Sequence, residues 1–409
     1  MKEAWIIDAA RTPRAIGKPG KGAYSGMHPQ RLMATVLRAL AQRNNLNTAE
    51  VDDVILGCSV QARQQGSCIA RMSALDAGWS THASGVTLDR FCGSSITSVG
   101  MAANSIMAGM EDLVVAGGVE MLSCYAAFGP LGHIDAGNLH LRELHPMGHV
   151  GISADIIAKE EGITRADLDL FAFQSQQKAA LALAGGYFKR SLVPVYRDDG
   201  SLALDTEEFP RPGTTLESLA GLKPVFGHLM DVAVDDAGTT YRQLVEKRWP
   251  GLQLEHVHHA GSSSGVVDGA AALVLASPEY ARAHGMAPRA RIRTIVNSGG
   301  SPAHILNQPV PAALKALERA GMSINDIDLF EVNEAFAVVV VKFMRDLKLD
   351  PAKINVNGGA IALGHPVGAT GAMLIGTVLD ELERQGKSTG MVTMCAAGGM
   401  APAIIIERI

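Results

Sequence analysis

The chain has 409 residues and a formal net charge of −5, with 44 glycines and only 5% aromatic residues. This length allows two or three domains, or one large domain with two lobes. The hydrophobic fraction of 47% excludes an intrinsically disordered chain, and the negative charge argues against a dedicated nucleic-acid-binding protein, which needs a basic face. The apolar stretches are far shorter than the roughly 18 residues of a membrane span, so we expect no transmembrane segment.

Short apolar segments in the first half predict strands that alternate with helices. The N-terminal sequence carries Glu3 and Asp8 around its apolar run, which favours a first strand over 5–9 and argues against a signal peptide. The next predicted elements are a helix over 29–43, strands over 54–56 and 85–88, a helix over 94–108 and a strand over 113–116 that ends at Gly117-Gly118. Short buried strands between helices are typical of a largely parallel sheet.

The C-terminal third repeats this alternation. Its predicted elements are a helix over 312–320, a strand over 327–330, a helix over 371–385 and strands over 391–394 and 403–406. Segment 314–334 resembles segment 37–57, because in each an amphipathic helix leads to an aspartate, Asp328 or Asp53, and then to a strand. The similarity indicates an internal duplication, although α/β chains also resemble themselves through their alternation alone.

The middle of the chain breaks the pattern. It contains Gly-Pro turns and a polar helix predicted over 164–183, and it reads as an insertion. We therefore predict an N-terminal half made of 1–122 plus 258–279, an inserted covering domain over 123–257, and a C-terminal half over 280–409. The insertion is expected to cover the place where helix N-termini of the two halves meet.

The five cysteines show no Cys-x-x-Cys spacing, which indicates free thiols in a reducing compartment. Cys92 follows a predicted strand and precedes a predicted helix, where unpaired N–H groups and the helix dipole lower the pKa of a thiol. The sequence therefore offers Cys92 as a nucleophile, which iodoacetamide is expected to alkylate faster than Cys58 or Cys68. The competing interpretation is an inert buried cysteine, and it is preferred for Cys58 and Cys68.

A glycine-rich segment surrounds His365. Five glycines fall within 358–371, so the backbone there can approach a ligand closely. The segment lacks the Gly-Lys-Ser/Thr of a P-loop and the acidic residue that follows a Rossmann fingerprint, which leaves His365 as a candidate base. Further on, Cys395 ends an apolar strand before Gly398-Gly399, and the backbone amides between them are candidate anion donors.

Two polar residues, Asn333 and Glu334, end another predicted strand, and they either form a hydrogen-bond network or serve chemistry. A thiol nucleophile, a histidine base and backbone amides that bind an oxyanion are together the parts for acyl transfer. The second cysteine adds an acid/base. Carbon–carbon bond formation next to a thioester needs such a group, because a proton at the α-carbon must be removed or returned.

Several motifs resemble those of the thiolase family, in order across nearly the whole chain. They are AARTP (9–13), DRFCGSS (89–95), GGVEMLS (117–123), PRPGTT (210–215), NEAFA (333–337), NGGAIALGHPVGATGA (357–372) and the final Cys-x-x-Gly-Gly. The resemblance implies an α/β chain with a duplicated five-layer αβαβα fold and an inserted loop domain. It also implies an acyltransferase, an acetyl-CoA C-acyltransferase or C-acetyltransferase that performs reversible Claisen condensation or thiolysis of 3-ketoacyl-CoA.

The resemblance also implies a role for each residue of the site. Cys92 is the expected acylated nucleophile, and His365 is the expected base that activates it and donates to the thioester oxygen. Cys395 is the expected acid/base at the α-carbon of the acetyl group, and Asn333 is expected to hold the water that completes this oxyanion hole. The second hole uses the backbone N–H of Cys92 and of Ala397. The family usually carries glycine at this last position, so the Ala397 methyl group is expected to narrow the site.

Coenzyme A contacts follow from further similar segments, at Arg211, Ser218, Ala260, Ser264 and His149. Val150 stands where short-chain acetoacetyl enzymes commonly carry methionine, which argues against strict acetoacetyl specificity. The stretch 123–149 is shorter than is typical of the family, and this favours a dimer over a tetramer. The stretch 228–257 is longer than is typical, and it either reshapes the acyl pocket, adds an interface or is a tolerated surface insertion.

The resemblance implies coenzyme A as a co-substrate, with no resident cofactor and no metal. His256, His258 and His259 suggest a metal site, but we expect no acidic or cysteine partner near them, and the family needs no metal. The expected partners are acyl-CoA, coenzyme A and a second copy in a homodimer or a dimer of dimers, without nucleic acid. The expected location is cytoplasmic and the expected role is in fatty acid metabolism.

Two other functions stay open. The first is a condensing enzyme of the same fold with a carrier-protein substrate, which the second cysteine disfavours. The second is a catalytically silent, thiolase-like protein that binds coenzyme A, which the intact set of Cys92, His365, Cys395 and Asn333 disfavours.

Overall fold

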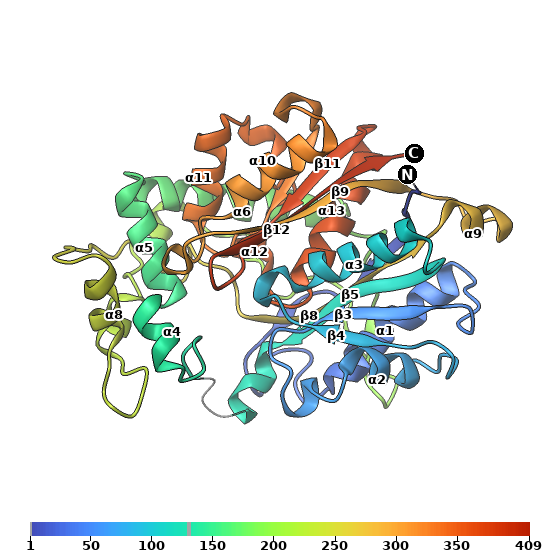
Figure 1. The fold of residues 1–409 in the computed structure, drawn as a ribbon, viewed down its shortest axis with the longest axis horizontal. Coiled ribbons are helices and arrows are strands. Elements are labelled where there is room, and N and C mark those ends of the chain that lie inside the picture. Colours follow the sequence, from blue (N-terminus) through green and yellow to red (C-terminus); the bar gives the residue numbers. More distant parts are fainter. Residues whose placement is uncertain (1, 129–131) are drawn as a thin grey trace.

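The computed structural model describes residues 2–128 and 132–409. Its centre is one mixed sheet of ten strands (Figure 1). In spatial order the sheet contains β10 (Leu329–Val332), β11 (Thr389–Thr393), β12 (Met400–Arg408), β9 (Ala290–Gly299), β1 (Trp5–Arg11), β8 (Val267–Ala276), β5 (Leu113–Met121), β3 (Asp53–Gly57) and β4 (Val86–Leu88), while β2 (Ala15–Ile16) pairs with β8.

The two halves of this sheet have the same strand order. In the N-terminal half, β3 pairs in parallel with β4 and β5, while β8 pairs antiparallel with both β5 and β1. In the C-terminal half, β10 pairs in parallel with β11 and with the bridge residue Ile354, while β12 pairs antiparallel with both β11 and β9. The halves join where Trp5 and Ile6 of β1 meet β9. The strand topology is therefore duplicated, as the sequence indicated.

Each half also uses one aspartate to hold the start of a buried strand. Asp52 Oδ2 accepts hydrogen bonds from the N–H groups at 112–113, at 2.8 and 3.1 Å, and Asp328 Oδ2 accepts from those at 388–389, at 2.9 and 3.0 Å. The sequence comparison had matched Asp328 with Asp53. The structural equivalent is Asp52, because Asp53 is already the first residue of β3.

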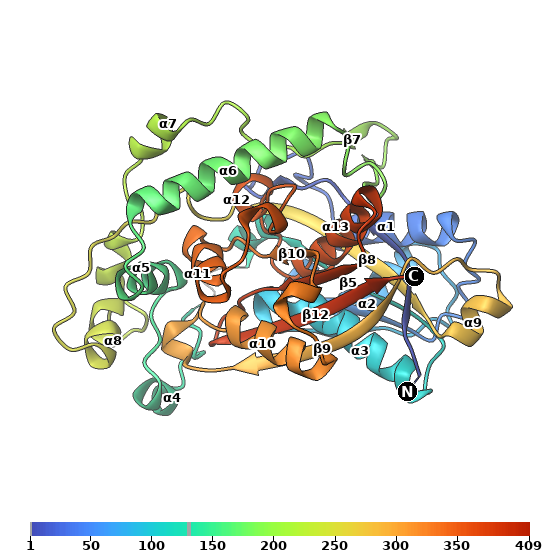
Figure 2. The same ribbon diagram turned by 90° about the horizontal axis from the view of Figure 1, so that it is seen from above.

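Helices cover both faces of each half-sheet and complete five αβαβα layers (Figures 1 and 2). The central layer consists of α3 (Ser94–Ala108) and α13 (Thr370–Gln385), which share one apolar core with strands of both halves. The outer helices are α1 (Pro29–Arg43) and α2 (Ile69–Asp76) on the N-terminal half, and α10 (Pro309–Ala320) and α11 (Ala337–Leu347) on the C-terminal half. The predicted fold class is confirmed.

Alternate residues of each strand face different layers. In β5, Leu113 and Val115 belong to the core beneath α1 and α2, while Val114 and Ala116 belong to the core shared with α3 and α13. Both faces of the strand are therefore apolar, because helices cover both. This explains why the strands read as continuous apolar runs in the sequence.

Two sequence predictions about the sheet are wrong. The sheet is mixed and not largely parallel, because β8 and β12 each run antiparallel to both of their neighbours. The strand β5 does not end at Gly117-Gly118 but continues to Met121. A Cβ at Gly117 would lie 2.0 Å from the Ala271 carbonyl oxygen, so the glycine allows close strand pairing and does not end the strand.

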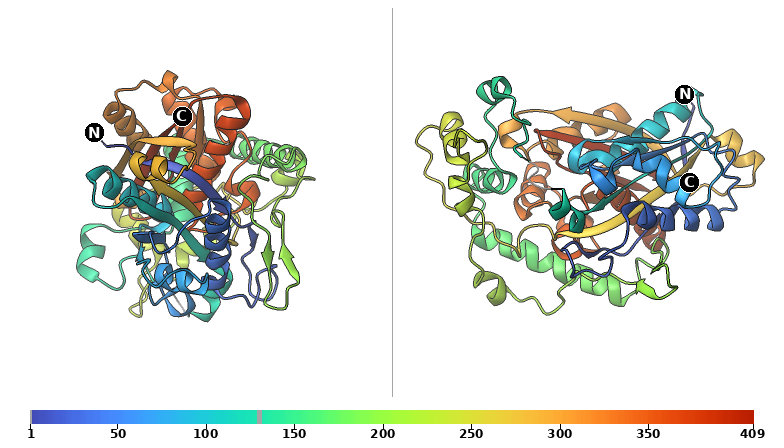
Figure 3. Two further views of the ribbon diagram at one scale, coloured as in Figure 1. Left: turned by 90° about the vertical axis from the view of Figure 1, so that its right-hand side faces the viewer. Right: turned by 90° about the horizontal axis from the view of Figure 1, so that it is seen from below.

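In Figure 3 the middle of the chain, coloured green to yellow, lies along the outside of the layers, while α9 lies at the opposite end from α8 (Figure 1). The remaining elements come from this middle part and from connections between the layers. They are the α-helices α4 (Leu139–Leu144), α5 (Val150–Glu160), α6 (Arg165–Ala184), α7 (Leu216–Ala220), α8 (Tyr241–Arg248), α9 (Pro278–Ala283) and α12 (Ala360–Leu363), the hairpin of β6 (Val195–Tyr196) and β7 (Leu202–Leu204), and the 3-10 helices η1 (Arg63–Gln65), η2 (Phe91–Gly93), η3 (Leu122–Ala127), η4 (Gly227–Asp231), η5 (Pro302–His304), η6 (Ile324–Asp326) and η7 (Pro351–Lys353). Across the described ranges, no helix has the length and apolar character needed to cross a membrane. The domain boundaries drawn from the sequence stay predictions.

The close approach of α3 and α13 depends on a glycine at the start of α13. A Cβ at Gly371 would lie 2.7 Å from the backbone nitrogen of Ile96 and 3.0 Å from Ser95 Oγ. The next residue, Ala372, donates its N–H to the same Ser95 Oγ at 2.9 Å. A side chain at position 371 would therefore push the two central helices apart.

We expect Gly371→Ala to lower the free energy of unfolding by about 1–3 kcal/mol, the usual cost of overpacking a core. Alanine is intrinsically better than glycine in a helix, so the sign of the change separates packing from helix propensity. Gly376→Ala is the matched control on the same helix, because its nearest neighbour would be Ala9 Cβ at 3.3 Å. Urea denaturation measures both variants, and equal changes in stability would contradict the close helix approach.

Candidate active site

Cys92 lies in η2, between the end of β4 and the start of α3. The residue before it, Phe91, has a φ of 49°, a left-handed conformation that is strained for a residue with a side chain. Asp89 Oδ1 accepts from the Phe91 N–H at 2.6 Å. Ser94 Oγ accepts from the Arg90 N–H at 2.9 Å and donates to the Phe91 carbonyl at 2.6 Å. This strained, hydrogen-bonded turn fixes the backbone that carries the thiol.

Burial raises the pKa of the Cys92 thiol to about 12, and the carboxylates of Glu120 and Asp89 act in the same direction. The residue keeps partial solvent exposure. The sequence predicted a pKa lowered by a helix N-terminus, and the raised pKa contradicts it: α3 begins only at Ser94, with Gly93 as its N-cap, and burial is the largest influence on the thiol. A Cys92 thiolate at neutral pH therefore needs a base to take its proton.

His365 is a buried histidine between α12 and α13. Its Nδ1 lies 2.6 Å from Thr370 Oγ1, and that hydroxyl donates its proton to the Pro366 carbonyl at 3.0 Å. A hydroxyl has a single proton, so Thr370 accepts from Nδ1–H and the lone pair of the ring lies on Nε2. Burial, with the charge of Arg14, lowers the pKa of His365 to about 3. The structure thus provides a neutral base whose accepting atom is Nε2.

Asn333 follows β10 directly and faces this base, with its Nδ2 at 3.4 Å from His365 Nε2. Its Oδ1 is buried and has no hydrogen-bond partner within the part of the chain that the structure describes. An unpaired buried amide oxygen costs about 1–3 kcal/mol, so this atom marks a place for a water or a ligand group.

Glu334, the neighbour of Asn333, has a structural role. Its carboxylate accepts from Ser175 Oγ at 2.6 Å, from Asn355 Nδ2 at 2.9 Å and from the Ile361 N–H at 3.1 Å. These bonds tie α6 and α12 to the end of β10. The sequence left open whether these two polar residues form a hydrogen-bond network or serve chemistry. In the structure Asn333 faces His365, whereas Glu334 forms a hydrogen-bond network.

Cys395 follows β11 and is buried. The pKa of its thiol is raised well above the ordinary value, first by burial and then by the neighbouring Cys92 thiol. A Cβ at Gly93 would lie 2.8 Å from Pro402 Cδ and 3.5 Å from Ala396 Cβ, so glycine lets the Cys92 turn approach the segment after Cys395. The two thiols therefore belong to one site.

After Cys395 the chain turns back in a tight hairpin. Ala396 and Met400 exchange backbone hydrogen bonds of 2.7 and 3.1 Å, and the positive φ angles of Gly398 and Gly399, 78° and 74°, close the turn. Ala397 sits in this turn, and its N–H donates to no protein acceptor among the described residues. The Cys92 N–H is equally free of a protein acceptor within the described ranges. Both predicted oxyanion donors are thus available.

Sequence reasoning missed Glu120, a buried carboxylate in β5. Glu120 accepts from the backbone N–H groups of Ser59 at 2.8 Å and Gly368 at 2.9 Å, and from Gln65 Nε2 at 2.7 Å. It therefore ties the loop after β3 to the loop that carries His365. A single acid inside an apolar strand was the available signal, because a buried charge needs partners.

Three contacts lead from the surface to the base along the predicted coenzyme A path. Arg211 is exposed, and its guanidinium lies 5.6 Å from the centroid of the Phe209 ring. That ring lies against Gly265, where a Cβ would be 2.3 Å from it. The Gly265 carbonyl then accepts from the His365 N–H at 2.9 Å.

Ser218 and Ala260, two other predicted coenzyme A contacts, are both exposed. Their segments touch each other: a Cβ at Gly261 would lie 2.6 Å from Leu219 Cδ2. Ser218 itself is used in the capping box of α7, with Thr215 as the N-cap. The two segments form adjoining walls near the surface.

Ser264 and His149 lie deeper. The Ser264 N–H donates to the Ala335 carbonyl at 3.0 Å. This bond attaches the segment before β8 to the NEAFA segment, 333–337. His149 is the N-cap of α5, and its Nδ1 accepts from the Gly151 N–H at 3.1 Å. Its ring stacks on Phe226 at 6.0 Å between centroids. The structure thus places Arg211, Ser218, Ala260 and Ser264 on or beside 259–265. His149 connects to this segment only through Phe226 and Phe336, and the roles of all five stay predictions.

The three histidines before this segment have acidic partners that the sequence order hid. Asp155 accepts from Nδ1 of His256 and of His258, each at 2.7 Å, and Asp169 pairs with His259 Nε2 at 2.6 Å. The expectation of no acidic neighbour is therefore wrong, because α5 and α6 bring these aspartates from far away in the chain. Within residues 2–128 and 132–409, no group of three or more such side chains is placed to hold a metal ion.

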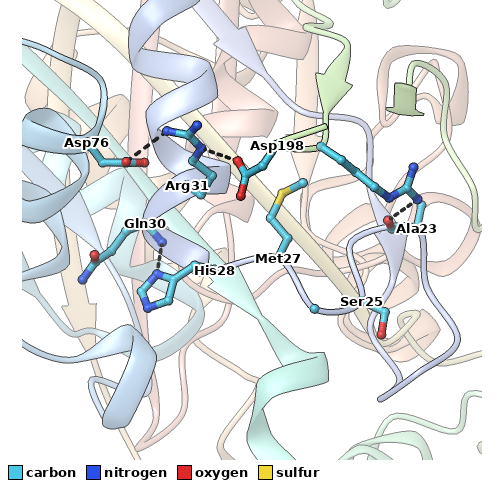
Figure 4. A pocket seen from close by; sticks show the side chains of 10 residues that line it. Ala23, Ser25, Met27, His28, Gln30, Arg31, Asp76 and Asp198 are labelled. Carbon is cyan, nitrogen blue, oxygen red and sulfur yellow. Dashed lines mark hydrogen bonds and ion pairs between the residues drawn. The ribbon is translucent and has the colours of Figure 1, made fainter. Parts of the chain in front are cut away.

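A surface hollow of about 560 Å³ lies elsewhere, between the start of α1 and the β6–β7 hairpin (Figure 4). Three of its charged side chains form ion pairs, since Arg31 contacts Asp76 and Asp198, both at 3.1 Å. His28 caps α1 by accepting from the Gln30 N–H. None of the predicted catalytic side chains lines this hollow, so it is not the candidate active site.

The geometry defines an acyl-transfer site in a duplicated α/β fold, with two thiols and one neutral histidine. The chain belongs to the thiolase family: the thiolase N-terminal domain matches residues 4–239 and the thiolase C-terminal domain matches residues 286–408. It is accordingly an enzyme of the acyltransferase class.

Similar proteins span the whole chain. Steroid 3-ketoacyl-CoA thiolase FadA6 of Mycobacterium tuberculosis is 40% identical over 100% of this chain and 95% of its own length. Beta-ketoadipyl-CoA thiolase of Pseudomonas knackmussii is 38% identical over 100% of both chains. 3-Ketoacyl-CoA thiolase of Shewanella loihica is also 38% identical over 100% of both chains.

The order of thiol alkylation tests the raised pKa of Cys92. Cys68 is exposed, whereas the Cys92 thiol is protonated at neutral pH, so iodoacetamide should label Cys68 first, against the order expected from the sequence. While the pH is below the pKa of Cys92, the labelling rate of Cys92 should rise about tenfold for each unit by which the pH is raised. Peptide mass spectrometry measures both rates, and faster labelling of Cys92 than of Cys68 at neutral pH would contradict the assignment.

The pH dependence of acylation tests the neutral base. Because the pKa of His365 is lowered to about 3, it should remain able to accept a proton throughout the range from about pH 8 to about pH 5. A histidine of ordinary pKa, about 6.5, would be protonated progressively in that range and the rate would fall. Rapid-quench measurement of the acyl-enzyme should give a flat profile, and a limb near pH 6.5 would disprove the lowered pKa.

Proposed function

We propose that this enzyme catalyses reversible thiolysis of 3-ketoacyl-CoA, and the reverse Claisen condensation, through an acyl-enzyme at Cys92. The observations that carry the proposal are the neighbouring thiols of raised pKa, Cys92 and Cys395, and the neutral base His365, which precedes the helix that packs against the Cys92 turn. A simple acyl transfer needs one nucleophile and one base. The second thiol supplies the proton that a carbon acid must gain or lose.

In the cleavage direction, Cys92 transfers its proton to His365 Nε2 and its sulfur attacks the 3-keto carbon. The bond between C2 and C3 breaks, which leaves an acyl group on Cys92 and the enolate of acetyl-CoA. The Cys395 thiol, protonated because its pKa is raised, gives its proton to the enolate carbon. After acetyl-CoA departs, coenzyme A gives its thiol proton to Cys395, attacks the acyl-enzyme and releases the shortened acyl-CoA, while His365 returns the proton to Cys92.

Both oxyanions that form during this reaction, the tetrahedral intermediate and the enolate, have hydrogen-bond donors that we propose for them. The free N–H groups of Cys92 and Ala397 support a hole for the tetrahedral intermediate at the acylated sulfur. His365 and a water held by the unpaired Oδ1 of Asn333 support a second hole for the enolate oxygen. The methyl group of Ala397 leaves its amide free, so we propose that the departure from the usual glycine is compatible with turnover.

We propose coenzyme A as the co-substrate, with no resident cofactor and no metal, because thiol and imidazole groups suffice for every proton transfer above. The relatives named for steroid and beta-ketoadipyl substrates support an acyl group larger than acetoacetyl. Val150, partly exposed at the start of α5, is compatible with such a group.

We also propose a role in fatty acid metabolism and a cytoplasmic location for a homodimer. The free cysteines support a reducing compartment. The edge strand β4 supports the dimer, because it ends the sheet and exposes 39% of Val86; Leu75 of α2 and Met101 of α3 are exposed as well. Light scattering at micromolar concentration should give twice the chain mass, and a monomer would contradict the dimer.

Variants of the two thiols test whether Cys92 is the nucleophile and Cys395 is the acid/base. Cys92→Ala should lower thiolysis of acetoacetyl-CoA and of longer 3-ketoacyl-CoA by at least about a thousandfold, because the nucleophile is lost. Cys395→Ala should lose turnover as well, yet it should still be acylated at Cys92 by acetyl-CoA, because that half-reaction moves no proton on carbon. Intact mass spectrometry detects the acyl group.

The matched control is Cys68→Ala, which removes an exposed thiol that has no part in the proposed chemistry and should keep wild-type turnover. Robust turnover by Cys92→Ala would disprove the mechanism. Absence of turnover by the wild type with every chain length would favour a silent binding protein instead.

A further inference from the structure

A row of aromatic and imidazole rings runs from the candidate active site to helix α8. Phe336, three residues after Asn333, packs edge-on against Phe226 at 5.5 Å between centroids. Phe226 stacks on His149 at 6.0 Å, and His149 meets the ring of Tyr241 edge-on at 5.8 Å. Phe226, His149 and Tyr241 are all partly exposed, so the row is a wall and not a closed core.

Apart from His149, which the sequence placed among the coenzyme A contacts, the residues of this row lie outside the predicted coenzyme A path. The coenzyme A path follows Arg211 and the segment of α7, whereas the row ends on α8. In Figure 2, α7 lies at the upper left and α8 at the lower left, well apart from each other. An acyl-CoA bound with its thioester at Cys92 extends in two directions. Because Arg211 and α7 lie on the coenzyme A path, we infer that the row faces the acyl group.

His149 presents a hydrogen-bond donor to this wall. Its Nδ1 accepts from the Gly151 N–H at 3.1 Å, and burial lowers the pKa of His149, so the ring is neutral. A neutral imidazole that accepts at Nδ1 carries its proton at Nε2. Within the described residues, that Nε2–H has no protein acceptor.

Tyr241 presents a second polar group beside it. Thr240 caps α8 in a capping box with Gln243, and Leu244 and Val245 are buried, which fixes Tyr241 at the first position of the helix. The apolar cluster that holds this helix against α5 includes Ile152. Among the described residues no partner bonds to the Tyr241 hydroxyl, which is therefore free to bind a ligand oxygen.

The cations near this wall are already neutralised. Arg142 pairs with Asp135 at 2.6 Å and also with Asp235. On α8, Arg242 pairs with Asp231 at 2.8 Å and Lys247 pairs with Glu143. The free groups that remain on the wall are neutral donors, which suit a carbonyl oxygen better than a carboxylate.

We propose that Tyr241 and His149 determine acyl specificity, by binding a neutral carbonyl oxygen at the far end of an otherwise apolar acyl group. The inserted stretch 228–257 thereby has a function, because it delivers Tyr241 to the acyl wall. The preferred substrate is a 3-ketoacyl-CoA whose acyl group is apolar along Phe336 and Phe226 and carries a ketone at its distal end. This inference rests on the proposed thiolase reaction.

Tyr241→Phe tests it, since the variant loses only the hydroxyl. The substrates are three 3-ketoacyl-CoA thioesters of equal length that end in a ketone, a methylene group or a carboxylate, with acetoacetyl-CoA as the short reference. Tyr241→Phe should lower kcat/KM for the ketone substrate about five- to tenfold, the worth of one neutral hydrogen bond, and leave the methylene substrate and acetoacetyl-CoA unchanged. The exposed Tyr196, changed to Phe, is the matched control.

His149→Asn is the second variant. Asparagine can keep the cap of α5 by accepting from Gly151, but it cannot place a donor where Nε2–H lies. Because His149 is also a predicted coenzyme A contact, its readout is the ratio between substrates: kcat/KM should fall more for the ketone substrate than for the methylene substrate.

The outcomes separate the two levels of inference. Turnover of acetoacetyl-CoA by the wild type establishes the reaction, and its absence would remove the proposed function and the specificity with it. With turnover present, a wild-type preference for the carboxylate substrate, an equal loss on all substrates or no loss in either variant would overturn the specificity alone.

Discussion

The packing of α3 against α13 is the constraint on which the rest of the structure depends. Both helices lie between two half-sheets of the same topology, and both contribute to one core. Their approach is close because Gly371 faces the backbone at Ile96. Cys92 precedes one helix and His365 precedes the other, so a contact made for packing also sets the distance between nucleophile and base.

Burial gives this site its chemistry. It raises the pKa of both thiols and lowers that of His365, so every group is neutral before substrate arrives. A neutral site avoids the cost of burying charge, and proton transfer creates charge only where free amides are available. Glu120 and Glu334 are acidic residues buried beside these groups, and the oxygens of both accept hydrogen bonds that hold loops of the site in place.

The helices and the residues of chemistry were largely predictable from the sequence. The predicted helices over 29–43 and 94–108 have those bounds in the structure, because apolar spacing and small residues act locally. Long-range pairing was not predictable: the antiparallel direction of β8 and the aspartates that hold His256 and His259 come from segments far apart in the chain. Glu120 stayed hidden because its partners are known only once the loops meet.

By itself the sequence determined the family, the duplicated α/β architecture and the residue types at the site, because motifs and periodicity are local properties of the chain. Tertiary structure decided the pKa values of the site residues and which groups surround them. The pKa of Cys92 is raised to about 12 although a helix follows it, since desolvation is a property of the packed environment. The accepting atom of His365 and the place of Tyr241 on the acyl wall likewise depend on partners that only folding brings within reach.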